Sequence, residues 1–186
     1  MIAARSASTL TTFLLRAVFV LAGSALMYAG AKFSISIGIV PITGQTLALP
    51  IVVALLGTRL GTTAVLAYII EGAAGLPVFA HGAATAALFG PTGGYLWAMP
   101  PAAMIIGIMF DAGFGDGPIR RFIAIFIGTA FVIITGTTWL QVFTGSFRAA
   151  FAAGVVPFII GDLLKCAIAS AVPANYWPRI AAKHKL

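Results

Sequence analysis

Long runs of apolar residues, separated by short stretches rich in glycine, proline or charge, cover most of the chain. The runs lie at residues 13–33, 46–57, 61–75, 93–112, 121–144 and 149–173. A helix needs roughly 17–25 apolar residues to cross the hydrocarbon core of a membrane, so the length of the chain allows about six crossings joined by short loops. The pattern predicts an all-α integral membrane protein, a six-transmembrane-helix bundle in which residues 1–186 form a single membrane-embedded domain.

The second and third runs are shorter than the others. Only the segment Gly57-Thr58-Arg59-Leu60-Gly61 separates them. Read as two crossings, they complete a bundle of six helices with both termini on one side. The alternative is a long helical hairpin that counts as one re-entrant element.

Composition supports a membrane protein. Hydrophobic residues make up 61% of the chain and charged residues 8%, whereas about a quarter of the residues in soluble domains are charged. The mean hydropathy is +1.08. Most of the surface is therefore expected to face membrane lipids.

Basic residues are distributed unevenly between the two sides of a six-crossing bundle. Lys32 and Arg148 lie on one side, and Lys165 lies inside a run. The side of the termini holds Arg5, Arg16, Arg59, Arg120, Arg121, Arg179, Lys183 and Lys185. Because Lys and Arg accumulate in cytoplasmic loops, we expect a multi-pass protein of the cytoplasmic membrane with both termini in the cytoplasm. Anionic lipid head groups account for the net charge of +7 without a nucleic-acid partner.

Two loops on the opposite side, residues 38–46 and 75–95, are rich in Gly and Pro and nearly free of charge. Irregular backbone at membrane depth is tolerated where protein buries it or where it borders a cavity. We therefore expect these loops to fold into the outer end of the bundle and wall a pocket. Ordinary interfacial turns are the alternative.

Ionisable residues inside apolar runs are costly and call for an explanation. Asp162 and Lys165 are three residues apart, which places them on one face of a helix. They form either a structural ion pair or a pair that shares a small polar ligand. Glu71, near the outer end of its run, is a weaker candidate for proton transfer.

The first run carries small residues at Ala22, Ala25 and Ala29. Small residues at such spacing let another helix approach closely. Packing inside the bundle and docking to another membrane protein explain this pattern equally well.

Several chemistries find no support in the sequence. It has no phosphate-binding loop of the Gly-x-x-x-x-Gly-Lys-Ser/Thr type and no His-Glu-x-x-His motif. The single cysteine is Cys166, and the two histidines, His81 and His184, fall on opposite sides. We expect no enzyme activity, no metal and no cofactor.

Three motifs narrow the interpretation. They are Val40-Pro41-Ile42-Thr43-Gly44-Gln45-Thr46-Leu47, then Gly75-Leu76-Pro77-Val78-Phe79-Ala80 leading to Gly90-Pro91-Thr92-Gly93-Gly94-Tyr95, and Gly161-Asp162-Leu163-Leu164-Lys165. In this order and spacing the chain resembles the BioY family, the biotin-binding substrate subunits (S components) of energy-coupling-factor (ECF) transporters. The resemblance extends over nearly the whole chain.

The resemblance implies an S-component fold that binds biotin at its outer side and takes part in biotin uptake. It also implies that Asp162 and Lys165 contact the vitamin. The thiophane ring and valerate chain of biotin need apolar walls, for which Phe79, Tyr95 and Trp139 are candidates. Thr43, Gln45 and the loop glycines Gly82 and Gly93 are then expected to shape the lid and supply hydrogen bonds. Leu96 stands where some relatives carry a basic residue, so the partner of the biotin carboxylate is left open.

The resemblance also implies partners: a membrane coupling protein and ABC-type ATPase subunits, with Ala22, Ala25 and Ala29 as the docking face. A solitary or homo-oligomeric biotin transporter is an alternative. A structural or assembly protein without a ligand is another.

Overall fold

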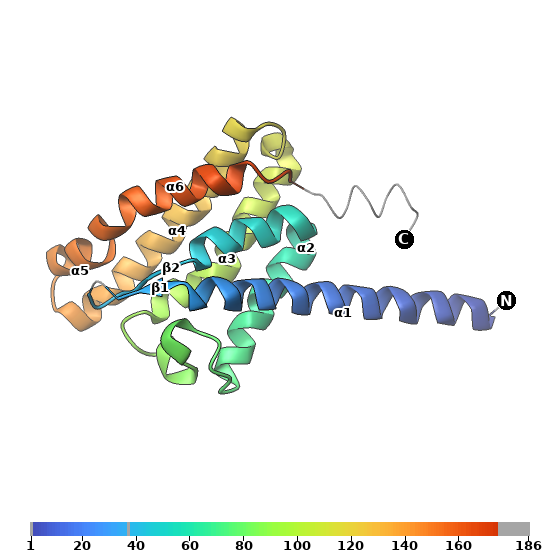
Figure 1. Cartoon of the computed structure of the whole chain (residues 1–186), viewed down its shortest axis with the longest axis horizontal. Coiled ribbons are helices and arrows are strands. Elements are labelled where there is room, and N and C mark those ends of the chain that lie inside the picture. The colour runs from blue at the N-terminus through green and yellow to red at the C-terminus, as the bar shows by residue number, and fades with distance from the viewer. Residues whose placement is uncertain (1, 37, 175–186) are drawn as a thin grey trace.

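The computed structural model describes residues 2–36 and 38–174, with side chains from residue 10 onward. The first helix runs along the long axis of the molecule, part of another helix crosses it steeply, and two irregular loops lie toward the end at which the first helix finishes (Figure 1). The helices are α1 (Ile2–Lys32), α2 (Gln45–Ala73), α3 (Gly93–Met109), α4 (Pro118–Thr144), α5 (Phe147–Gly154) and α6 (Ile159–Ser170). The shorter elements are strands β1 (Ser34–Ile35) and β2 (Ile42–Thr43) and helical turns η1 (Ala80–Gly82), η2 (Thr85–Leu88), η3 (Phe110–Phe114) and η4 (Val156–Phe158).

Helix α2 contains both the second and the third apolar run. Gly57 interrupts it with φ 77° and ψ 177°, which are not helical values. Beyond this residue the helix folds back on itself. The close approach of its two arms shows this: a Cβ atom added at Gly61 would lie only 2.9 Å from the Cα atom of Val53. The break is therefore where the pattern placed it, but the two runs form one sharply bent element.

The predicted count of six crossings is not confirmed. Five helical segments of the described part of the chain are long and apolar enough to cross a membrane: Leu10–Lys32, Gln45–Ala73, Gly93–Phe114, Pro118–Thr144 and Phe147–Ser170. The count differs because α2, with 29 residues, is a single segment here. Its bend leaves neither arm with the roughly 20 residues that a straight crossing needs. The last segment is also interrupted, by η4 between α5 and α6.

Close helix contacts depend on glycine. The space that a Cβ atom would occupy at Gly94 of α3 is filled by Trp139 of α4. The space at Gly136 of α4 is filled by the ring of Tyr95 from α3. Small residues allow helix backbones in a membrane to approach closely. This reciprocal contact fixes α3 against α4 and sets the position of Tyr95.

Hydrogen bonds at one end of the bundle join helices that are distant in sequence. Thr58, beside the bend of α2, donates to the Oδ2 atom of Asp111 at 2.6 Å. Arg121, near the start of α4, donates through Nε to the carbonyl oxygen of Ser170 at 2.7 Å. The bend of α2, the end of α3, the start of α4 and the end of α6 thus share one end.

Basic residues of the described part of the chain lie in two groups, one at each end of the bundle. Arg59, Arg120 and Arg121 belong to the end just described, whereas Lys32 and Arg148 lie at the end with the loops and strands. For these five residues the separation agrees with the grouping expected from the sequence, whereas Arg16 lies midway along α1. Arg179, Lys183, His184 and Lys185 lie outside the described residues, as does the side chain of Arg5.

Candidate functional site

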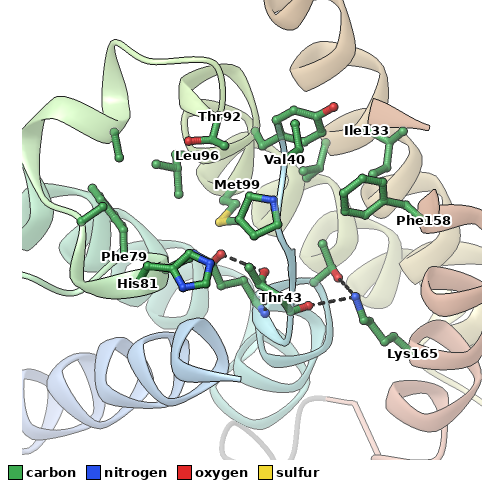
Figure 2. A pocket seen from close by; sticks show the side chains of 18 residues that line it. Val40, Thr43, Phe79, His81, Thr92, Leu96, Met99, Ile133, Phe158 and Lys165 are labelled. Carbon is green, nitrogen blue, oxygen red and sulfur yellow. Dashed lines mark hydrogen bonds between the residues drawn. The ribbon is translucent and has the colours of Figure 1, made fainter. Parts of the chain in front are cut away.

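A cavity of about 260 Å³ lies at the loop end of the bundle (Figure 2). The loop before β2, the start of α2 and the 75–92 loop form one part of its wall. Helices α3, α4 and α6 and the turn η4 form the rest. Its lining residues are Val40, Pro41, Thr43, Gln45, Thr46, Phe79, Ala80, His81, Ala83, Ala87, Thr92, Tyr95, Leu96, Met99, Val132, Ile133, Phe158 and Lys165. The lining is mostly apolar with a few polar groups, which is typical of small-molecule sites.

Lys165 provides the main polar group of the cavity. Its Nζ atom donates to the carbonyl oxygen of Thr43 at 2.9 Å, the Oγ1 atom of Thr46 at 3.0 Å and the Oδ1 atom of Asp162 at 3.0 Å. Figure 2 shows the first two of these bonds reaching from α6 to the hairpin strand and the start of α2. An ammonium group has three donors. The three contacts therefore account for all of them.

Asp162 lies behind Lys165, not in the cavity wall. Its Oδ1 atom accepts hydrogen bonds from Thr46 and Lys165, both at 3.0 Å. Its Oδ2 atom is buried and has no hydrogen-bond partner among the described residues. Asp162 lines a separate apolar groove between α4 and α6. The carboxylate thus neutralises Lys165 and keeps one unused acceptor.

Gln45 and Thr43 form a second polar group at the start of α2. Thr43 Oγ1 donates to Gln45 Oε1 at 2.9 Å, and Gln45 Nε2 donates to the hydroxyl of Tyr68 at 2.7 Å. The Tyr68 hydroxyl donates in turn to the carbonyl oxygen of Val78 at 3.1 Å. Tyr68 is fully buried and packs edge-on against Phe79, with ring centroids 5.3 Å apart. One tyrosine thereby fixes Gln45 and the loop that carries Phe79.

The predicted site residues do not all meet at the cavity. Five of them line it: Thr43, Gln45, Phe79, Tyr95 and Lys165. Gly82 and Gly93 are absent from the lining, although residues next to each take part in it. Trp139 is also outside it, 38% exposed, with its indole N–H donating to the carbonyl oxygen of Gly90 at 2.9 Å. Trp139 and Gly93 are better described as supports of the 75–92 loop.

Sequence reasoning did not assign several cavity residues. Thr46 belongs to a motif that was noted, yet its hydroxyl bonds to both Lys165 and Asp162 could not be foreseen. Phe158 comes from η4 and stacks near Tyr95, with ring centroids 6.4 Å apart. Val132 and Ile133 belong to the long apolar helix α4. Nothing in an apolar run distinguishes residues that face a cavity from those that face lipid.

The alanines of α1 point away from the bundle. Ala22, Ala25 and Ala29 are exposed, whereas Ser24 and Met27 on the opposite face are buried. Of the two interpretations of this pattern, the geometry excludes packing inside the subunit. The alanines form a smooth outer strip on α1.

Glu71 is part of the contact between α1 and α2. Its Oε2 atom accepts a hydrogen bond of 2.6 Å from the hydroxyl of Ser24. Glu71 does not line the cavity. Its position between two helices does not require a role in proton transfer.

Comparisons with known proteins agree on one family. Residues 4–182 match the model of the BioY family. A protein of Pyrococcus horikoshii named "Probable biotin transporter BioY" is 41% identical over 146 residues, which cover 78% of this chain and 85% of that protein. The "Biotin transporter BioY2" of Lactococcus lactis is 35% identical over 148 residues, covering 77% of this chain and 79% of the relative.

The fold also matches a solved structure. The crystal structure of the S component for biotin from an ECF-type ABC transporter superposes with a TM-score of 0.79. The match covers 87% of this chain and 90% of that chain at 24% sequence identity. The arrangement of helices is therefore that of an S component.

Proposed function

The chain belongs to the BioY family, and we propose that it is a membrane subunit that captures biotin for uptake. It is a multi-pass transport protein and not an enzyme. The observation that carries the proposal is the cavity, in which the Lys165–Thr43–Thr46 cluster faces apolar walls. Biotin combines a polar ureido ring with an apolar thiophane ring and valerate chain.

The polar cluster suits the ureido group. A ureido carbonyl is a strong hydrogen-bond acceptor, so it can replace one of the present partners of the Lys165 ammonium group. The two ureido N–H groups need acceptors of their own. Thr43, Gln45 and Thr46 supply oxygen atoms at the same place. Asp162 supplies the negative charge that keeps Lys165 neutralised, and its unused Oδ2 atom is a further acceptor after a small rearrangement. Phe79, Tyr95 and Phe158 supply the apolar surface for the rest of biotin.

The outward strip of α1 supports a docking role for this helix. Transport by a substrate-capture subunit needs energy from partners, here a membrane coupling protein and ABC-type ATPases. Ala22, Ala25 and Ala29 are exposed and small, which lets a partner helix approach the backbone of α1. The same strip also suits a second copy of this chain. Purification from the native membrane distinguishes two alternatives. Copurification of ATPase subunits supports a transporter with partner subunits, and their absence supports a solitary transporter.

We further propose that the loop end faces outward in the cytoplasmic membrane and that both termini are cytoplasmic. The basic residues Arg59, Arg120 and Arg121 at the opposite end support this orientation. The proposal includes six crossings, with each arm of α2 entering the membrane separately, because an even number of crossings is what places both termini on one side.

One observation also fits a structural role for the ion pair. All three donors of Lys165 are used within the protein, as they would be in a packing device without a ligand. Mass spectrometry of small molecules that copurify with the detergent-solubilised chain tests the proposed function. Biotin bound in stoichiometric amount supports it, whereas a protein that retains no biotin after growth with biotin, and binds none when it is added, refutes it.

A further inference from the structure

The cavity has two lining residues that can carry a positive charge. Among the eighteen residues that line it, Lys165 and His81 are the basic ones. Lys165 is paired with Asp162 at 3.0 Å, so this pair contributes no net charge. Among the lining residues, His81 is therefore the basic one that is not paired with a carboxylate.

A carboxylate ligand needs a hydrogen-bond donor. An ionised carboxylate is costly to remove from water without a partner, and His81, which is exposed, can offer a donor where the cavity opens to solvent. Biotin carries its carboxylate at the end of the valerate chain, far from the ureido ring that we place at Lys165. The neutral Lys165–Asp162 pair cannot compensate for a second negative charge. The molecule thus requires a separate partner at the other end of biotin.

His81 is held at the cavity by the loop geometry. It lies in η1 with φ 56°, a left-handed conformation that is uncommon for residues other than glycine. Its Nε2 atom is 2.9 Å from the hydroxyl of Ser36, the residue that follows β1. Figure 2 shows Lys165 and His81 on opposite sides of Thr43. A ligand with its ring at Lys165 and its chain along the cavity therefore points its far end toward His81.

We infer that His81 binds the carboxylate of biotin and selects for acids over neutral analogues. This inference rests on the proposed function. Ser36 engages Nε2, and Nδ1 is the ring nitrogen that we assign to the ligand. A hydrogen bond from an imidazole N–H to a carboxylate is charge-assisted and stronger than one between two neutral groups. Strained backbone at a ligand site is consistent with such a role.

The inference can be tested by calorimetric titration of the purified full chain with two ligands. One is biotin, and the other is biotinol, in which a neutral alcohol replaces the carboxylate. Three variants are compared with the wild type. His81→Asn removes the imidazole with a residue that tolerates left-handed backbone. His81→Arg supplies a permanently charged donor at the same position. Lys165→Ala is the matched control at the ureido end.

We expect His81→Asn to weaken biotin binding by about tenfold or more, as for other lost charged hydrogen bonds, and biotinol binding by less than about twofold. His81→Arg should retain the preference for biotin, and Lys165→Ala should weaken both ligands alike. Unchanged biotin affinity in His81→Asn, or equal loss of both ligands at an unchanged melting temperature, overturns the inference. A wild type that binds neither ligand refutes the proposed function as well.

Discussion

At the scale of single residues, the cavity combines groups from distant parts of the sequence. Lys165 is 122 residues from Thr43, whose carbonyl oxygen it contacts. The sequence motifs correctly indicated that these residues are special, but spacing along a helix could explain only the contact between Lys165 and Asp162. The bonds to Thr43 and Thr46 depend on the packing of α6 against α2, and no local pattern encodes that packing.

The first prediction concerns the ion pair. We expect Asp162→Asn and Lys165→Ala each to weaken biotin binding by more than about tenfold while the bundle stays folded. Losing one partner of a buried charged hydrogen bond costs roughly 1–3 kcal/mol, and about 1.4 kcal/mol is a factor of ten in affinity. Calorimetric binding beside a thermal melting curve measures both quantities. Loss of folding with unchanged affinity in the folded fraction would assign the pair a structural role instead.

The second prediction concerns Tyr68, which does not line the cavity but bonds to Gln45. We expect Tyr68→Phe to weaken biotin binding several-fold, because the Gln45 amide loses the partner that orients it. The ring contact with Phe79 is retained in this variant, so packing is preserved.

A double-mutant cycle provides the control for Tyr68. If Tyr68 acts through Gln45, the effect of Tyr68→Phe should vanish when Gln45 is already replaced by Ala. Additive losses in Tyr68→Phe/Gln45→Ala would show that Tyr68 acts on binding by another route.

At the scale of elements, the apolar runs located the long helices well. The predicted runs 93–112 and 121–144 correspond to α3 and α4 within three residues at each end. A helix that faces lipid must be apolar over its length, and composition alone reveals this. The sequence located the break in α2 at Gly57–Gly61 and left open whether the two runs form one helical hairpin or two crossings. The break between α5 and α6 was not resolved, because it depends on the backbone of η4 and not on composition.

Gly57 provides the third prediction. Its φ of 77° and ψ of 177° are strained for any residue with a side chain. Gly57→Ala should therefore destabilise the bundle by about 1–3 kcal/mol. Gly161→Ala is the matched control, because that glycine lies in α6 without positive φ and with open space around it. Thermal melting in detergent compares the two. Equal melting temperatures would mean that the bend tolerates a side chain.

The outer strip of α1 gives the fourth prediction. Replacing Ala25 and Ala29 together with Leu should lower biotin uptake in cells and leave biotin binding by the purified protein unchanged, since both alanines are exposed and neither lines the cavity. Ala167→Leu, at an exposed position of α6, is the control and should leave uptake unchanged. A loss of binding that parallels the loss of uptake would show that the strip is needed within the subunit.

At the scale of the whole molecule, the two ends of the bundle differ in character. One end gathers basic residues and the bend of α2, and the other holds the cavity and its loops. This polarity supports the proposed orientation, in which ligand enters at the loop end. The sequence predicted this polarity because basic residues are easily counted.

Orientation provides the fifth prediction. An impermeant thiol reagent applied to intact cells should label Ala86→Cys, in the exposed loop at the cavity end, and should not label Arg59→Cys at the bend of α2. The native Cys166 is buried, so it contributes little background. The reverse labelling pattern would invert the proposed topology.

The central claim is that the Asp162–Lys165 pair serves biotin and not only the packing of α6. Its most direct test is calorimetric titration of biotin into a double variant, Asp162→Leu/Lys165→Met, beside a melting curve. Replacement of a buried ion pair by apolar residues often preserves stability, so the double variant is expected to fold. Our account predicts a folded protein that has lost biotin binding. A folded double variant that binds biotin with the affinity of the wild type would contradict it.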